Sequence, residues 1–165
     1  MFRNQQDGSF VSVTEGSVFD VQRPSEPAAI VDFDLDGRLD LVVGHWNQSP
    51  GYRLYRNTSA TAGNWIGFRL EGGGPVNRDA IGTKVVIDAG DGPPQTRELR
   101  AGESRGSSHQ QRLHFGLGAQ DSADVTVVWP DGLTQTMQAM PAGQYHQLSY
   151  PEDNILFTDR FSASP

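Results

Sequence analysis

From Asn64 onward, apolar and polar residues alternate in short segments that predict β-strands. Turn-rich stretches such as "EGGG", "GDGPP" and "PDG" separate these segments. None of the alternating segments has the period of an α-helix. Strands of this length at this spacing are typical of a β-sandwich or barrel. We therefore expect a small sandwich-like domain of about seven strands, which begin at Asn64, Thr83, Gln95, Arg112, Asp124, Leu133 and Gln144.

The residues before Asn64 contain a short repeated motif. "MFRN" at Met1–Asn4 and "LYRN" at Leu54–Asn57 lie 53 residues apart, near the upper end of the periods of repeat proteins. Repeats of this kind need at least about three neighbours to bury a core. The pattern predicts the end of one repeat and about one full repeat over residues 1–57, a second β domain over 58–150 and a tail over 151–165. We expect the chain to be the C-terminal fragment of a longer repeat protein.

The stretch "VDFDLDGRLDLVVG" predicts a calcium loop between two strands. Alternate carboxylates can converge on one cation if the chain curls, and Gly37 permits the positive φ that a curl needs. Hard oxygen ligands in this number suit Ca²⁺ better than Mg²⁺. An EF-hand would carry glutamate where Val43 stands, and the flanks are strand-like. The alternative is a solvated acidic turn. The predicted ligands are the carboxylates of Asp32, Asp34, Asp36 and Asp40 with the backbone carbonyl of Arg38.

The composition changes the list of partners. The chain has a net charge of −7, which disfavours nucleic acid and anionic membranes. It has no cysteine, so neither disulfides nor thiolate metal sites are expected. No apolar run is long enough for a membrane helix, and the N-terminus does not look like a signal peptide.

Two family resemblances follow from these motifs. "DFDLDGRLDLVVG" followed by "LYRN" resembles an FG-GAP/VCBS repeat, the blade unit of integrin-type β-propellers. That resemblance implies Ca²⁺ in the aspartate loop, further blades upstream and a secreted or periplasmic location. The second part resembles the ASPIC/UnbV domain that follows such propellers. The motifs that carry the second resemblance are Asn77–Val85, Arg112–Gly118 and Val127–Gly132.

The sequence gives weaker support to catalytic or sugar-binding sites than to the calcium loop. "GESRG" places Ser104 in a G-x-S-x-G pattern, but no helix follows it, as a nucleophile elbow requires. His109 and His114 lie five residues apart, on opposite faces if both are in one strand, which disfavours a shared metal site, and His114 is expected to have a structural role. Trp46, Trp65 and Trp129 could stack on sugars, although packing is the default. Trp129 should pack at a strand end, and Trp65 could fill the joint between the two parts.

The sequence therefore predicts an all-β chain, with one calcium-bearing propeller-type blade and a small sandwich-like domain. We expect a calcium-stabilised extracellular binding or adhesion module with no catalytic residues. Its ligand would be an unidentified protein or carbohydrate. The alternative is the accessory C-terminal part of a larger secreted enzyme, with its catalytic residues outside this chain or at an interface.

Overall fold

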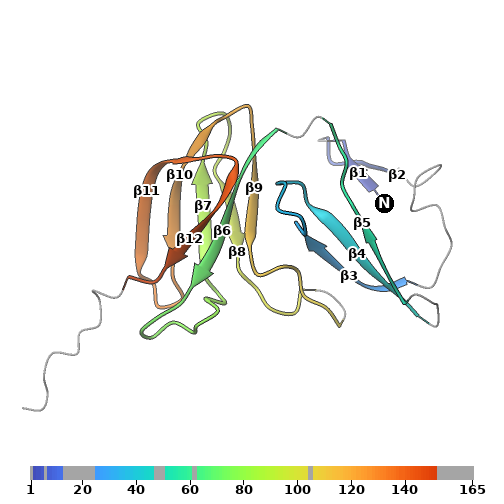
Figure 1. The fold of residues 1–165 in the computed structure, drawn as a ribbon. Helices are drawn as coiled ribbons and strands as arrows, with labels where there is room; N and C mark the ends of the chain where they lie inside the picture. Colours follow the sequence, from blue (N-terminus) through green and yellow to red (C-terminus); the bar gives the residue numbers. More distant parts are fainter. Residues whose placement is uncertain are drawn as a thin grey trace, which may run out of the picture.

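The computed structural model describes residues 2–5, 7–12, 25–46, 51–60, 63–103 and 106–151. Within these ranges the regular elements are twelve β-strands, which confirms the predicted all-β class (Figure 1). No helix in the described part of the chain is long and apolar enough to cross a membrane. The predictions for Ser104 and for most of the tail lie outside the described residues.

The second part consists of two sheets. One has the order β11-β10-β7-β8 and the other the order β12-β6-β9, in which β12 runs parallel to β6. The seven strands fall where the alternating segments predict them. Their bounds are β6 Asn64–Glu71, β7 Lys84–Asp88, β8 Gln95–Glu98, β9 Leu113–Gly118, β10 Ser122–Val128, β11 Thr134–Pro141 and β12 Gln144–Ser149.

A single apolar core lies between these two sheets. Alternate residues of β6 and β9 face residues of β7 and β10, and the Phe68 and Phe115 rings meet edge-on with centroids 5.9 Å apart. Trp129 follows β10 and is 1% exposed, packed edge-on against Tyr150. This confirms its predicted place at a strand end. The largest fully buried apolar side chains are Trp129, Phe68, Phe115, Ile66, Ile87, Leu117, Val85, Val125 and Val127.

The first part holds two smaller sheets. A hairpin pairs β1 (Phe2–Asn4) with β2 (Phe10–Ser12). A three-stranded antiparallel sheet has the order β3-β4-β5, with β3 Ser25–Val31, β4 Asp40–His45 and β5 Tyr52–Tyr55. Figure 1 shows this sheet beside the two facing sheets, on the side of β9. A complete propeller-type blade stays a prediction.

Burial divides the chain sharply. The buried apolar residues of the described part all lie between Ile66 and Tyr150. The exposed large apolar side chains of the same ranges all lie between Phe2 and Leu54, with Phe2 71% and Trp46 70% exposed. Full burial of a large apolar side chain stabilises the fold by roughly 1.5–3 kcal/mol, and a side chain left in water does not contribute this free energy. The first part therefore lacks a core of its own.

We expect the two parts to differ when expressed separately. A fragment of residues 58–151 should melt cooperatively because it holds the whole core, whereas residues 1–57 should show no cooperative transition. Thermal melting followed by circular dichroism measures both. A sharp transition of the 1–57 fragment alone would contradict this division.

Candidate metal site at the junction of the two parts

Asp32 organises the acidic loop, residues 32–40, that joins β3 to β4. Its side chain is fully buried, and its carboxylate accepts the backbone N–H groups of Asp36 and Gly37, each at 3.1 Å. Gly37 has a φ of +83°, which lets the chain turn back over the carboxylate. The first aspartate of the motif therefore folds the loop around itself.

Asp40 closes the other end of the loop. It is 3% exposed, and its two oxygens accept the Phe33 N–H at 3.2 Å and the Asn57 N–H at 2.7 Å. Asn57 also donates through its amide to the Leu39 carbonyl at 3.2 Å. Asn57, the last residue of the repeated motif "LYRN", thus joins the acidic loop to the segment after β5.

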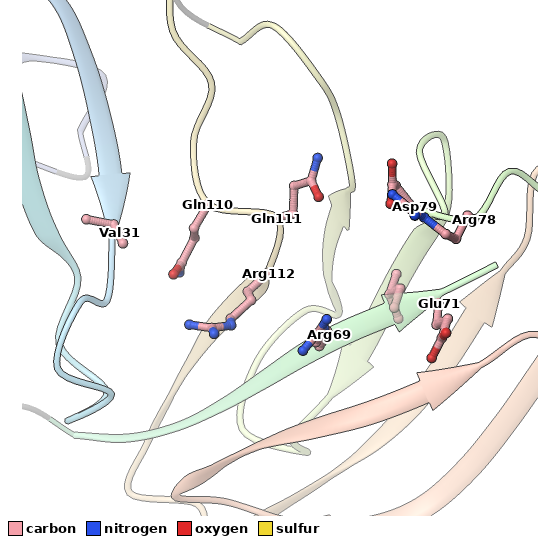
Figure 2. A pocket seen from close by; sticks show the side chains of 9 residues that line it. Val31, Arg69, Glu71, Arg78, Asp79, Gln110, Gln111 and Arg112 are labelled. Atoms are coloured by element: carbon pink, nitrogen blue, oxygen red, sulfur yellow. Dashed lines mark hydrogen bonds and ion pairs between the residues drawn. The ribbon is translucent and has the colours of Figure 1, made fainter.

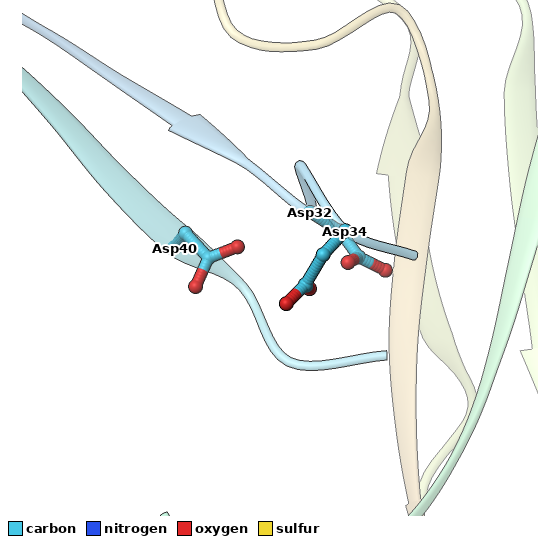
Figure 3. Close-up of side chains that lie close together, drawn as sticks. All are labelled: Asp32, Asp34 and Asp40. Carbon is cyan, nitrogen blue, oxygen red and sulfur yellow. The ribbon is translucent and has the colours of Figure 1, made fainter. Parts of the chain in front are cut away.

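Three carboxylates of the loop converge. Asp32, Asp34 and Asp40 each place one oxygen within 4.8 Å of the other two (Figure 3). Oxygens that bind one Ca²⁺ at about 2.3–2.6 Å are at most roughly 5 Å apart, so one ion can reach all three. Two of these carboxylates are buried, where unpaired negative charge is costly. The donor set therefore fits a hard divalent cation.

Asp36 lies outside this trio. It accepts the Arg38 N–H at 2.9 Å and forms an ion pair with the Arg38 guanidinium. Arg56 reaches Asp34 at 2.7 Å and Asp36 at 3.5 Å. Two arginines therefore balance part of the negative charge of the loop. The ligand roles of Asp36 and of the Arg38 carbonyl stay predictions.

The loop rests on the outer face of the β12-β6-β9 sheet. We call this the docking face and define it as Trp65, Gly67, His114 and Tyr145. Gly67, His114 and Tyr145 are register partners across the three strands, so these residues lie side by side on the sheet. Trp65 stacks on His114 at 5.2 Å with an interplanar angle of 11°, and the Tyr145 ring is 4.8 Å from Trp65. The predicted place of Trp65 in the joint is confirmed.

Two hydrogen bonds join the docking face to the loop. The Tyr145 hydroxyl donates to Asp32 Oδ2 at 2.9 Å, and His114 Nε2 lies 2.9 Å from the Gly37 carbonyl. Because a carbonyl only accepts, Nε2 of His114 carries the proton. A β-carbon on Gly37 would overlap the Trp65 indole. Glycine at this position is therefore needed for close contact as well as for the turn.

Burial sets the protonation of both rings. Desolvation, reinforced by the Asp32 carboxylate, raises the pKa of Tyr145, so its hydroxyl stays a donor. Desolvation also lowers the pKa of His114, although the Gly37 carbonyl opposes the shift. His114 is therefore neutral near pH 7 and adds no cation beside the acidic loop.

A second seam runs along β3. The Ile30 N–H donates to His109 Nδ1 and the Gln110 N–H donates to the Ile30 carbonyl, each at 3.1 Å. Ser107 Oγ donates to the Ala28 carbonyl at 3.0 Å. Gln110 Oε1 also accepts the Asp32 N–H at 3.1 Å. His109 thus binds the backbone of β3.

These features define a class of protein: an all-β chain in which an acidic loop with three converging carboxylates is seated on the outer face of a two-sheet domain. A family model described as "ASPIC and UnbV" matches residues 73–155, and the chain belongs to that family. The expected ASPIC/UnbV resemblance is confirmed. The FG-GAP/VCBS assignment of the first part stays a prediction.

Similarity to relatives extends over both parts. Mouse cartilage acidic protein 1 is 24% identical over 154 residues, 92% of this chain and 24% of that protein. The human protein of that name is 24% identical over 160 residues, 95% of this chain and 24% of its own length. The Xenopus tropicalis protein is 26% identical over 133 residues, 79% of this chain and 20% of that protein. The chain thus spans about a quarter or less of the length of these relatives.

Gly37→Ala tests whether the loop needs close contact with Trp65. Gly8→Ala is a matched control, because Gly8 has a φ of +89° but no heavy atom within 4 Å of an added β-carbon. Both variants carry the backbone strain, and only Gly37→Ala adds overpacking. We expect it to lower the free energy of unfolding by roughly 1–3 kcal/mol more than Gly8→Ala in urea titrations. Equal losses would contradict the docked loop.

Tyr145→Phe tests the hydrogen bond to the buried carboxylate. Removing the hydroxyl leaves Asp32 without its donor from the docking face, and bonds to charged groups contribute roughly 1.5–3 kcal/mol. Tyr52→Phe is the control, since Tyr52 is 69% exposed. In urea titrations we expect Tyr145→Phe to lower the free energy of unfolding by this amount and Tyr52→Phe to leave it unchanged. If Tyr145→Phe lowers stability no more than the control does, the Tyr145 hydroxyl does not stabilise the junction.

Proposed function

We propose that this chain is a calcium-stabilised, non-catalytic binding module from the C-terminal end of a longer exported repeat protein. The observation that carries the proposal is the position of Asp32. One fully buried carboxylate belongs to the three converging aspartates and also accepts the Tyr145 hydroxyl of the docking face. An ion bound there would stabilise both the loop and the junction.

Calcium suits this site better than its competitors. The converging ligands are all carboxylate oxygens, and the chain has no cysteine that would favour zinc. A loop with flexible coordination accepts Ca²⁺ more readily than Mg²⁺, which demands a nearly ideal octahedron. Modules of the extracellular space commonly bind Ca²⁺ at roughly 10⁻⁴–10⁻³ M, which agrees with the exported location in the proposal.

The repeat architecture has two supports. The exposed large apolar side chains of the described ranges cluster in the first part, as expected of a surface that neighbouring repeats would cover. The relatives are about four times as long as the aligned stretch, so they have room for such repeats. Their name refers to cartilage, and this supports the export of the present chain as part of the proposal.

The non-catalytic role rests on how the histidines are used. His109, His114 and His146 each bond a backbone group through a ring nitrogen. A histidine used in this way holds strands and loops together, whereas a general base must face a substrate proton. The absence of catalysis remains part of the proposal, and an ester and glycoside substrate screen in calcium checks it. Turnover by the purified chain would contradict it.

Calcium should raise the melting temperature of the whole chain. If Ca²⁺ binds only the folded state, the free energy of unfolding rises by about 2.7 kcal/mol at a hundredfold excess over Kd. Asp34→Asn should abolish this rise with little other damage, because Asp34 is exposed and, in the described part of the chain, its side chain pairs only with Arg56. Asp91→Asn, on an exposed turn, is the control.

The measurement is differential scanning calorimetry with EDTA and with excess Ca²⁺. The proposal requires a shift in the wild type and in Asp91→Asn and none in Asp34→Asn. A wild-type melting temperature that is the same in EDTA and in Ca²⁺ would refute calcium stabilisation.

A further inference from the structure

The outer face of the β12-β6-β9 sheet is only half covered by the acidic loop. The docking face occupies one half. Two residues further along β6, Arg69 points away from the core, opposite Gln147 of β12, and Arg112 immediately precedes β9. This open half borders β3 at Val31 and the Gln110 side chain. It therefore lies in the same junction, next to the proposed calcium loop.

A cavity of about 690 Å³ occupies the open half, and we call it the junction pocket. Its polar lining comprises Arg69, Glu71, Arg78, Asp79, Gln110 and Arg112, together with Gln111. In Figure 2 the Arg112 side chain extends from the start of β9 toward β3, where Val31 lies. A pocket of this size and polarity suits a polar molecule of one or two sugar units better than an apolar ligand.

Two guanidinium groups of the pocket have no ion-pair partner among the residues that the structure describes. The ion pairs of the described residues use Arg38, Arg56, Arg78 and Arg100. The Arg112 guanidinium lies over the Tyr145 ring at 5.4 Å, whereas the Arg69 side chain makes no hydrogen bond or ion pair in the part of the chain that the structure describes. Guanidiniums without an anionic partner are available to a ligand, and their planar donors match a carboxylate.

The pocket also offers acceptors. Glu71 accepts one bond from Gln147 at 3.1 Å and keeps further lone pairs, and Asp79 faces Arg78 at 3.2 Å. Carboxylates in these positions accept bonds from hydroxyl groups but repel a dense anion such as sulfate. The lining thus combines a site for one negative charge with acceptors for hydroxyls.

We propose that the junction pocket binds a carboxylate-bearing sugar of the uronic acid class. The ligand carboxylate lies between Arg69 and Arg112, and its hydroxyls donate to Glu71 and Asp79. The assignment rests on the proposed function as a binding module and names the class of its ligand. Arg112 also contacts Tyr145, which bonds Asp32, so the pocket adjoins the proposed calcium loop through one ring.

Isothermal titration calorimetry on the full chain in calcium buffer tests this. The probes are a glucuronate-containing disaccharide, its neutral glucose counterpart and inorganic sulfate. We expect binding of the glucuronate probe, with the neutral sugar and sulfate each weaker by at least tenfold. Arg69→Gln, at an exposed position, should weaken glucuronate binding by roughly tenfold to a hundredfold. Arg112→Gln should act in the same direction, and Arg3→Gln on β1 should have no effect.

Four outcomes would overturn the assignment: no glucuronate binding, equal binding of the neutral sugar, equal binding of sulfate, or an Arg69→Gln variant that binds like Arg3→Gln. Melting temperatures of the same samples in EDTA and Ca²⁺ separate the two proposals. A normal calcium shift without glucuronate binding overturns the pocket alone. Binding that needs Arg69, in a protein without a calcium shift, supports the pocket and overturns calcium stabilisation.

Discussion

A buried carboxylate is the constraint on which the junction depends. Asp32 is fully inaccessible to solvent, and an ionised carboxylate in that position is stable only if its oxygens are satisfied. The loop supplies two backbone N–H groups, and the docking face supplies the Tyr145 hydroxyl. The loop conformation and the contact between the two parts thus satisfy the same carboxylate.

Several other residues follow from that arrangement. The Tyr145 ring lies over β6 because Gly67 has no side chain there, and a β-carbon at Gly67 would overlap the ring. Gly37 admits the Trp65 indole for the same reason, and a neutral His114 bonds the Gly37 carbonyl. Small residues on both sides of the junction therefore bring backbone and aromatic rings close enough to exclude water from Asp32. Lower effective dielectric strengthens each of these bonds.

The sequence predicted the local features well. Alternation placed the seven strands from β6 to β12, and the spacing of Asp32, Asp34 and Asp40 around Gly37 indicated a curled loop with converging carboxylates. Long-range partners were beyond its reach, because Tyr145 lies 113 residues from Asp32 and no periodicity links them. Arg56 and Asp34 also pair only through the fold, and no spacing in the sequence indicates that ion pair. The junction pocket combines side chains of four separate segments, which only the fold brings together.

We propose that the acidic loop and the docking face form one calcium-responsive unit. Native-state hydrogen exchange at the Gly37 amide, which donates to Asp32, reports on it directly. In wild type, calcium should slow this exchange strongly relative to EDTA, and Tyr145→Phe should speed it in both conditions by weakening the shared carboxylate site. If Gly37 exchanges at one rate with and without calcium, and Tyr145→Phe leaves that rate unchanged, the loop and the face are independent and the account is wrong.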